Sequence, residues 1–285
     1  MSTLSRRQLI KSSVAGASLL CGAGVFDVEA NPLGMPLGCQ TYPVRKMIAA
    51  DFPGTIKQLA AIGFRRIELC SPKGYAKAGF ADVAQYKGPA LRRLLGDMKV
   101  ECHSSHFSMH ELRADMPGSI AWAKDVGLRQ MMVPSLSGPK NPTMDDVKRV
   151  ADEFNKMAQR TADAGIPLGL HNEGFEASTI DGKRTYDVLF GLLDPKLVKF
   201  QFQCSEIEHG FVAADYFKKY PGRFISMHVQ DWSPERKEQV PVGQGSIDWK
   251  KTFAAAKIGG IKNYFVEMDL DLMKASVPYL RQLKD

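Results

Sequence analysis

Short apolar segments recur along the chain at intervals of roughly 30 residues, and a helix-forming stretch follows each of them. The expected strands are 37–41, 66–69, 100–103, 130–133, 167–171, 199–203, 224–228 and 264–267. The expected helices are 53–62, 89–98, 120–126, 144–164, 212–220, 249–256 and 272–282. Strands and helices in regular alternation are typical of a parallel β-sheet. Eight such units without a break in composition predict an α/β fold, a single (β/α)₈ TIM barrel.

The N-terminus has the pattern of a twin-arginine export signal. Arg6 and Arg7 precede an apolar run of small residues at 12–26, and Val28-Glu29-Ala30 has the small-x-small spacing of a cleavage site. We therefore expect residues 1–30 to be a signal peptide, residues 31–285 to be the catalytic barrel, and the mature protein to be periplasmic. The alternatives are an amphipathic first helix or a membrane anchor, but the apolar run is shorter than the roughly 20 residues of a membrane span. A stable anchor is not expected. Lipidation of Cys21 is rejected because Leu20 is too large for the position before a lipidated cysteine.

Four cysteines would remain after cleavage, namely Cys39, Cys70, Cys102 and Cys204. An oxidising compartment would allow two disulfides. Each cysteine lies in or beside an expected strand, however, and twin-arginine substrates fold in a reducing cytosol. We expect buried free thiols.

The charge balance gives no sign of a nucleic-acid partner. The formal net charge is +7, yet Lys and Arg are scattered and form no dense basic tract with interleaved aromatic residues. The sequence leaves the oligomeric state open and is compatible with a homo-oligomer.

Polar residues gather at the expected ends of the strands, where a barrel places its chemistry. They are Gln40, Tyr42, Glu68, His103, His106, His171, Asn172, Glu173, Glu176, Gln201, Gln203, His228, Gln230, Asp231, Glu267 and Asp269. A single His or Glu at a strand end is more often an ordinary hydrogen-bonded surface group. A set of imidazoles and carboxylates on one rim instead indicates a site for Mn, Zn, Fe or Co, and the lack of Cys pairs argues against a structural zinc site.

Three stretches carry a resemblance to the xylose-isomerase-like barrel superfamily of sugar phosphate isomerases and epimerases. They are 168–176 (LGLHNEGFE), 219–231 (KYPGRFISMHVQD) and 242–249 (VGQGSIDW). The resemblance covers almost the whole chain after residue 30. Exported members with a His-Asn motif after strand five resemble enzymes that act on 3-keto-glycosides.

The resemblance implies one divalent metal ion (Mn, Mg, Co or Zn) held by residues from strands five to eight. His228 and Glu267 match the family's ligands on strands seven and eight. On strand five Glu173 is the first choice of ligand and His171 the second. Gln203 stands where an Asp is common, and a neutral amide leaves the site one negative charge poorer. That departure would loosen the metal, make it a stronger Lewis acid, or mean that no metal binds.

The chemistry implied is removal of a proton from the carbon next to a carbonyl, followed by isomerisation, epimerisation or loss of a β-oxygen. Glu267 would be a ligand that also acts as the base, and Glu176 or His171 would be the acid/base on the opposite face. Gln40, Glu68 and His106 would contact substrate hydroxyls. Trp232 would cover an apolar sugar face, although ordinary packing explains it equally well.

The expected substrate is a neutral keto-sugar or glycoside, because an exported protein is a poor match for a sugar phosphate and no Gly-rich phosphate loop is present. Two other functions stay open. A phosphodiesterase like the barrel endonucleases of the same superfamily needs more His and Asp ligands than this rim offers. A non-catalytic periplasmic carbohydrate-binding barrel is compatible with Gln203.

Overall fold

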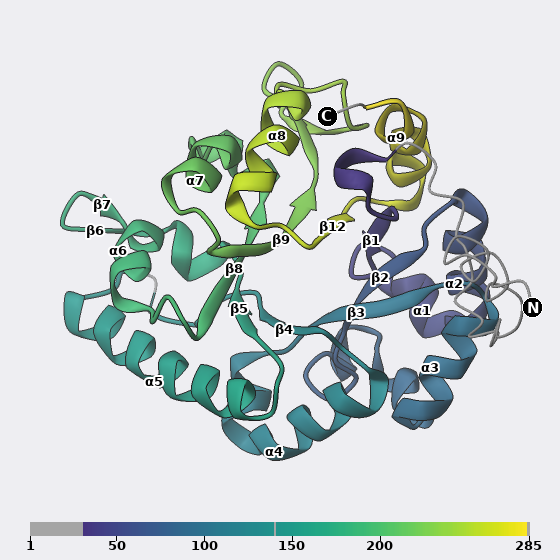
Figure 1. Cartoon of the computed structure of the whole chain (residues 1–285), viewed down its shortest axis with the longest axis horizontal. Helices are drawn as coiled ribbons and strands as arrows, with labels where there is room; N and C mark the ends of the chain where they lie inside the picture. The colour runs from purple at the N-terminus through teal and green to yellow at the C-terminus, as the bar shows by residue number, and fades with distance from the viewer. Residues whose placement is uncertain (1–30, 140, 284–285) are drawn as a thin grey trace, which may run out of the picture.

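All eight expected strands are present and pair in parallel around a closed ring, which confirms the predicted TIM barrel (Figure 1). The ring order is β1-β12-β9-β8-β5-β4-β3-β2. The strands are β1 (Gly38–Gln40), β2 (Arg66–Cys70), β3 (Glu101–His106), β4 (Gln130–Val133), β5 (Leu168–Leu170), β8 (Val198–Gln203), β9 (Phe224–Val229) and β12 (Asn263–Val266). The computed structural model describes residues 31–139 and 141–283, so the predicted export signal at 1–30 lies outside the described residues.

The helices form the outer layer of the barrel (Figure 1). They are α1 (Arg45–Ala50), α2 (Phe52–Ile62), α3 (Gly88–Asp97), α4 (Met109–Val126), α5 (Met144–Asp163), α6 (Thr185–Leu192), α7 (Ala213–Lys219), α8 (Trp249–Gly259) and α9 (Leu270–Gln282). Two short hairpins lie in the connections, β6 (Thr179–Ile180) with β7 (Lys183–Arg184) and β10 (Asp231–Ser233) with β11 (Glu238–Val240). Within the described part of the chain, none of the helices has the length and apolarity needed to cross a membrane.

Local signals fix several helix boundaries. Helix α5 begins at a capping box, in which the side chains of Thr143 and Asp146 each bond the backbone N–H of the other. Helix α4 begins eleven residues before the expected range, and its backbone leaves the helical region at Asp115, two residues before Pro117. A proline removes a helical hydrogen bond and crowds the preceding turn. The interruption explains why only the last two turns of α4 were expected.

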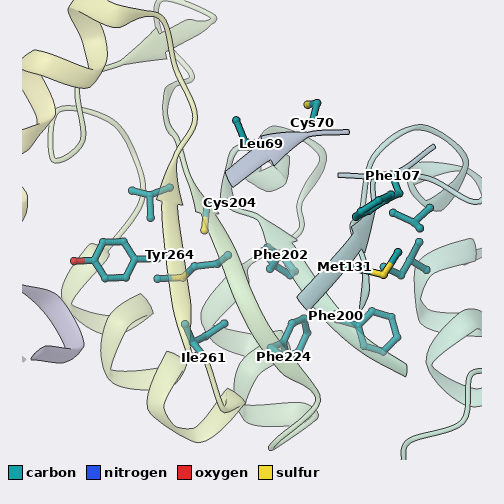
Figure 2. Close-up of a cluster of buried hydrophobic side chains, with 14 of the residues drawn as sticks. Leu69, Cys70, Phe107, Met131, Phe200, Phe202, Cys204, Phe224, Ile261 and Tyr264 are labelled. Atoms are coloured by element: carbon teal, nitrogen blue, oxygen red, sulfur yellow. The ribbon is translucent and has the colours of Figure 1, made fainter. Parts of the chain in front are cut away.

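Apolar side chains fill the space between strands and helices. Figure 2 shows part of this core, with Phe200, Phe202 and Phe224 on strands β8 and β9. Phe190 of α6 stacks on Phe200 with ring centroids 4.0 Å apart, and Phe217 of α7 meets Phe224 edge-on at 4.9 Å. Such aromatic pairs add about 0.5–1.5 kcal/mol each beyond area burial. The four cysteines of the described chain are buried and free, as predicted.

The inside of the barrel is polar rather than filled with branched aliphatic side chains. Gln130 on β4 donates to the hydroxyls of Ser104 and Ser226, both at 3.0 Å, and accepts from Asn263 at 3.2 Å. Gln201 donates to Ser226 at 2.9 Å and to Glu68 at 2.9 Å. A chain of hydrogen bonds therefore runs through the barrel and supports the residues at its carboxyl end from below.

Candidate active site at the carboxyl end of the barrel

His228, near the end of β9, is the centre of the polar cluster. Its side chain is fully buried between two carboxylates from other strands. Nε2 lies 2.5 Å from Oε2 of Glu68 on β2, and Nδ1 lies 2.9 Å from Oε2 of Glu267, the residue after β12. The ring stacks on His106 at 5.3 Å and approaches His171 at 4.5 Å between centroids. Three imidazoles and two carboxylates thus meet at one end of the barrel.

The ionisation of this cluster is set by competition between burial and charge. Burial alone would lower the pKa of His228, but the carboxylates of Glu267 and Glu68 raise it to about 10. Burial would raise the pKa of Glu68, but His106 and His228 hold it well below its usual value. The cluster is therefore an ion pair shielded from solvent, and removing either partner would leave a buried charge uncompensated.

Glu267 receives hydrogen bonds from two amides at the rim. Its Oε2 accepts from Nε2 of Gln203 at 2.7 Å and from Nε2 of Gln230 at 3.0 Å. The Gln203 amide also lies 3.3 Å from Oε1 of Glu173, so one NH₂ group stands between two carboxylates. Burial would raise the pKa of Glu173, but His171 lowers it to about 2.

Several buried polar atoms beside Glu267 have no hydrogen-bond partner among the described residues. They are both ring nitrogens of His171, Nδ1 of His228 and Oε1 of Gln203. Nδ1 of His228 is close to Glu267 but is not aligned for a hydrogen bond. Ligand atoms of His171, His228 and Glu267 lie within 4.8 Å of one another. Buried polar atoms normally have partners, so this donor set fits a divalent metal ion of the kind that imidazole and carboxylate bind.

A pocket of about 380 Å³ opens to solvent beside the cluster, and we call it the rim pocket. Its lining residues are Tyr42, Pro43, Arg45, Glu173, Gln203, Ser205, Glu206, Gln230, Gln239, Glu267, Met268 and Asp269. The walls are amides and carboxylates with one aromatic ring, Tyr42, on which the guanidinium of Arg45 rests at 4.5 Å. Such a surface suits a ligand with many hydroxyl groups.

Asp231 joins two of the sequence motifs into one wall of the site. Its buried Oδ2 accepts from the backbone N–H groups of Gly243 and Gly245 and from Nε1 of Trp249, at 2.8, 3.1 and 2.8 Å. A Cβ at Gly245 would lie 2.2 Å from this carboxylate, so only glycine lets the backbone come this close. Asp231 therefore holds the 242–249 loop against the strand that carries His228.

Three of the expected site residues belong neither to the rim pocket nor to the cluster around His228. Gln40 is buried, donates to Sγ of Cys70 at 3.7 Å and accepts from the backbone N–H of Tyr42. Trp232 lines a neighbouring pocket of about 490 Å³ with Ile207 and Pro234. Glu176 is fully buried, and its Oε1 accepts from the backbone N–H of Leu136 at 2.8 Å. We assign Glu176 to anchoring the loop after β4, because it does not face the rim pocket.

His103 does not belong to the strand-end cluster, and the expectation that it would is wrong. It lies with Glu101 and Arg129 in a pocket of about 300 Å³ at the amino end of the strands, with Nε2 3.0 Å from Oε2 of Glu101. The cause is that β3 runs on to His106, past its expected end at 103, so His103 lies inside the strand and not at its carboxyl end. His103 falls at a register shift, where Ile67 pairs with Cys102 but Glu68 pairs with Ser104. The side chain of His106, two residues after Ser104, points inward.

Burial gives Glu176 a role in stability that can be measured. It raises the pKa of Glu176 from the usual 4.5 to about 8, so the folded protein holds this proton near neutral pH and the unfolded chain does not. Stability should therefore fall as the pH rises from 4.5 to 8, by up to about 1.4 kcal/mol per pH unit. Glu176→Gln should flatten this dependence in thermal melts across that range. Glu235→Gln, on an exposed loop, is the control, and an unchanged pH slope in Glu176→Gln would contradict the assignment.

Comparisons with known proteins agree with the barrel fold. Residues 56–282 match the family model described as xylose isomerase-like TIM barrel. The fold is similar to a sugar phosphate isomerase/epimerase from Parabacteroides distasonis, with 23% identity and a TM-score of 0.68, covering 86% of this chain and 93% of the other. It is also similar to the probable 3-DHS dehydratase AsbF of Bacillus anthracis, with 12% identity, a TM-score of 0.66, and 86% and 98% of the two chains covered.

A third similar structure is the IolI protein with a bound zinc atom, at 11% identity and a TM-score of 0.63, with 87% of this chain and 94% of the other covered. A search of curated protein sequences found no match. The family match spans well over half of the chain and agrees with the closed parallel barrel. The chain belongs to the xylose isomerase-like TIM barrel family.

Proposed function

We propose that this protein is an exported, divalent-metal-dependent enzyme that removes a proton next to the carbonyl of a sugar or keto-sugar. The observation that carries the proposal is the set of unpartnered buried atoms of His171, His228 and Gln203 beside Glu267. Gln203 and Glu267 also line the rim pocket. Similar structures include a protein described as an L-ribulose 3-epimerase, at 13% identity, which agrees in substrate class.

His171, His228 and Glu267 would hold the ion. Gln203 has an unpartnered oxygen available as a fourth ligand. A bound divalent cation would supply a Lewis acid that polarises the substrate carbonyl and offsets the developing negative charge. The amides of Gln203 and Gln230 keep the carboxylate of Glu267 in place at the edge of the site.

Proton transfer would use the two carboxylates on either side of the Gln203 amide. Glu267 would take the proton from the substrate carbon, and Glu173, which is ionised in the free site, would accept this proton and deliver it to the other face, to the neighbouring carbon or to a leaving oxygen. Return of the proton to the opposite face gives epimerisation, return to the neighbouring carbon gives isomerisation, and loss of a β-oxygen gives a lyase reaction on a 3-keto-glycoside. In this proposal the strand-five ligand is His171, the second choice from the sequence. Glu173, the first choice, transfers protons instead.

The substrate we favour is a neutral keto-sugar or glycoside. The pocket wall carries the carboxylates of Glu173, Glu206, Glu267 and Asp269, and among the described residues that line it Arg45 is the one Lys or Arg side chain. A phosphate group would meet more negative than positive charge there. The decisive experiment is a screen of oxidised and unoxidised glycosides with and without Mn²⁺. Turnover of a keto-sugar only when metal is present would support the proposal, whereas saturable sugar binding without turnover or metal would favour a binding barrel.

Export rests on the sequence of the first 30 residues. We expect the mature protein to begin near Asn31, and replacement of Arg6 and Arg7 by Lys to keep the precursor in the cytoplasm, because the paired arginines are the recognition signal. Cell fractionation with N-terminal sequencing measures both. Periplasmic protein that still begins at Met1 would contradict the expectation.

A further inference from the structure

We propose that Glu68 is a positioning residue that holds His228 with Nε2–H as a donor, so that Nδ1 faces the metal site. The inference rests on the proposed metal site and gives Glu68 and His106 a different role from the contact with substrate hydroxyls expected from the sequence. Both side chains are buried, and neither lines the rim pocket.

Three hydrogen bonds from the barrel interior hold the Glu68 carboxylate, and the His106 ring lies beside it. Oε1 accepts from the Ser104 hydroxyl at 2.5 Å and from the Gln201 amide at 2.9 Å. Oε2 meets Nε2 of His228 at 2.5 Å and Nε2 of His106 at 3.2 Å. Ser104 and Gln201 keep this carboxylate from turning away, so it holds a proton on Nε2 of His228. When a metal ion replaces one of the two protons of the His228 imidazolium, the proton on Nε2 is the one that stays, and Nδ1 presents its lone pair on the side of Glu267 and His171.

The two ring nitrogens of His228 differ in their contacts, which indicate a hydrogen bond at Nε2 and a metal site at Nδ1. Two ligands of one octahedral ion, each about 2.1 Å from the metal, lie about 3 Å apart. The 2.9 Å between Nδ1 of His228 and Glu267 is compatible with this spacing. An ordinary hydrogen bond has the same length, but Nδ1 has no aligned partner among the described residues, which favours the metal site. The 2.5 Å between Nε2 and Glu68 is too short for two ligands of a shared ion, so this contact is a direct, short hydrogen bond.

His106 completes the arrangement without facing the pocket. Its Nε2 also lies 2.8 Å from Oε1 of Gln201, and its ring stacks on that of His228 with an angle of 21° between planes. The His106 ring thus limits rotation of the His228 ring. Gln201 in turn connects His106 to the hydrogen bonds inside the barrel. The carboxylate of Glu68 makes the bound imidazole a stronger ligand, and partners of this kind are worth about 10–100-fold in metal affinity.

The test measures metal affinity rather than turnover. Glu68→Gln should weaken binding of Zn²⁺ or Mn²⁺ by about 10–100-fold in calorimetric titration, because the charge behind the imidazole is lost. Glu111→Gln is the matched control, since Glu111 is another buried carboxylate held by serine hydroxyls, those of Ser71 and Ser119, outside the site. Circular dichroism and thermal melting show whether each variant is folded.

A second measurement needs no variant. Nitrogen-15 NMR of the zinc-loaded wild-type protein should show His228 bound through Nδ1 with a proton on Nε2. Ligation through Nε2, or a folded Glu68→Gln variant with wild-type affinity, would overturn the positioning role and leave the metal site standing. A wild-type protein that binds no divalent metal would instead overturn the proposed function, and this inference with it.

Discussion

His228→Gln is expected to lower divalent metal affinity by more than about 100-fold, because loss of a direct ligand should exceed the cost of losing a partner behind it. Gln keeps a side-chain N–H within reach of Glu68 and much of the volume, so the barrel should stay folded. Glu267→Ala, at the rim, should lose the metal as well. Metal analysis of purified protein and calorimetric titration measure both effects.

We replace His228 by Gln rather than Ala because the His228 side chain is buried. Although His228 lies near the end of a strand, its side chain is fully buried between Glu68 and Glu267. His228→Ala would leave two buried carboxylates without the cation between them, a change that costs about 3–5 kcal/mol in comparable sites. Wild-type metal affinity in a folded His228→Gln variant would remove His228 from the ligand set.

Glu173→Gln is expected to reduce kcat by about 10²–10⁴-fold with the metal still bound, because it removes a proton-transfer group and leaves His171, His228 and Glu267 in place. Of the two carboxylates proposed to transfer the proton, Glu173 is more exposed than Glu267, with 44% of its side chain accessible, so its replacement should not disturb the core. The measurement pairs steady-state kinetics with metal content.

Glu238→Gln on the exposed edge of β11 is the control for this variant, since it removes a nearby carboxylate that does not line the rim pocket. If Glu173→Gln loses the metal together with activity, Glu173 is a ligand, as the family resemblance implied. Full activity in this variant would show that proton transfer uses another group.

The barrel could be predicted from sequence because its signals are local. Each strand is a short apolar run followed by a helical pattern, and the expected strand 130–133 coincides with β4. Helices α1 and α6 and the two hairpins were missed because they lie in connections, where length and tertiary contacts rather than periodicity decide the structure. The polar residues of 103–106 hid the true end of β3, and this is why His103 was placed at the carboxyl end of the strand.

The site was predicted as a set of residue types but not as a network. Strand-end position identified His171, Glu173, Gln203, His228 and Glu267, all of which meet around one cluster. It could not show that Glu68 faces His228 from 160 positions away, or that Glu176 turns under the loop after β4. Arg45, Glu206 and Gln239 of the pocket wall lie beyond the strand ends and carry no pattern of their own.

The central claim is that one divalent metal ion binds between His171, His228 and Glu267. Anomalous diffraction from crystals grown with Mn²⁺ or Zn²⁺ tests it most directly, because it locates the ion and its ligands together. We predict a single strong peak within bonding distance of Nδ1 of His228 and a carboxylate oxygen of Glu267, and no peak between Glu68 and His106. An ordered barrel with no peak at this position, at metal concentrations well above micromolar, would contradict the account.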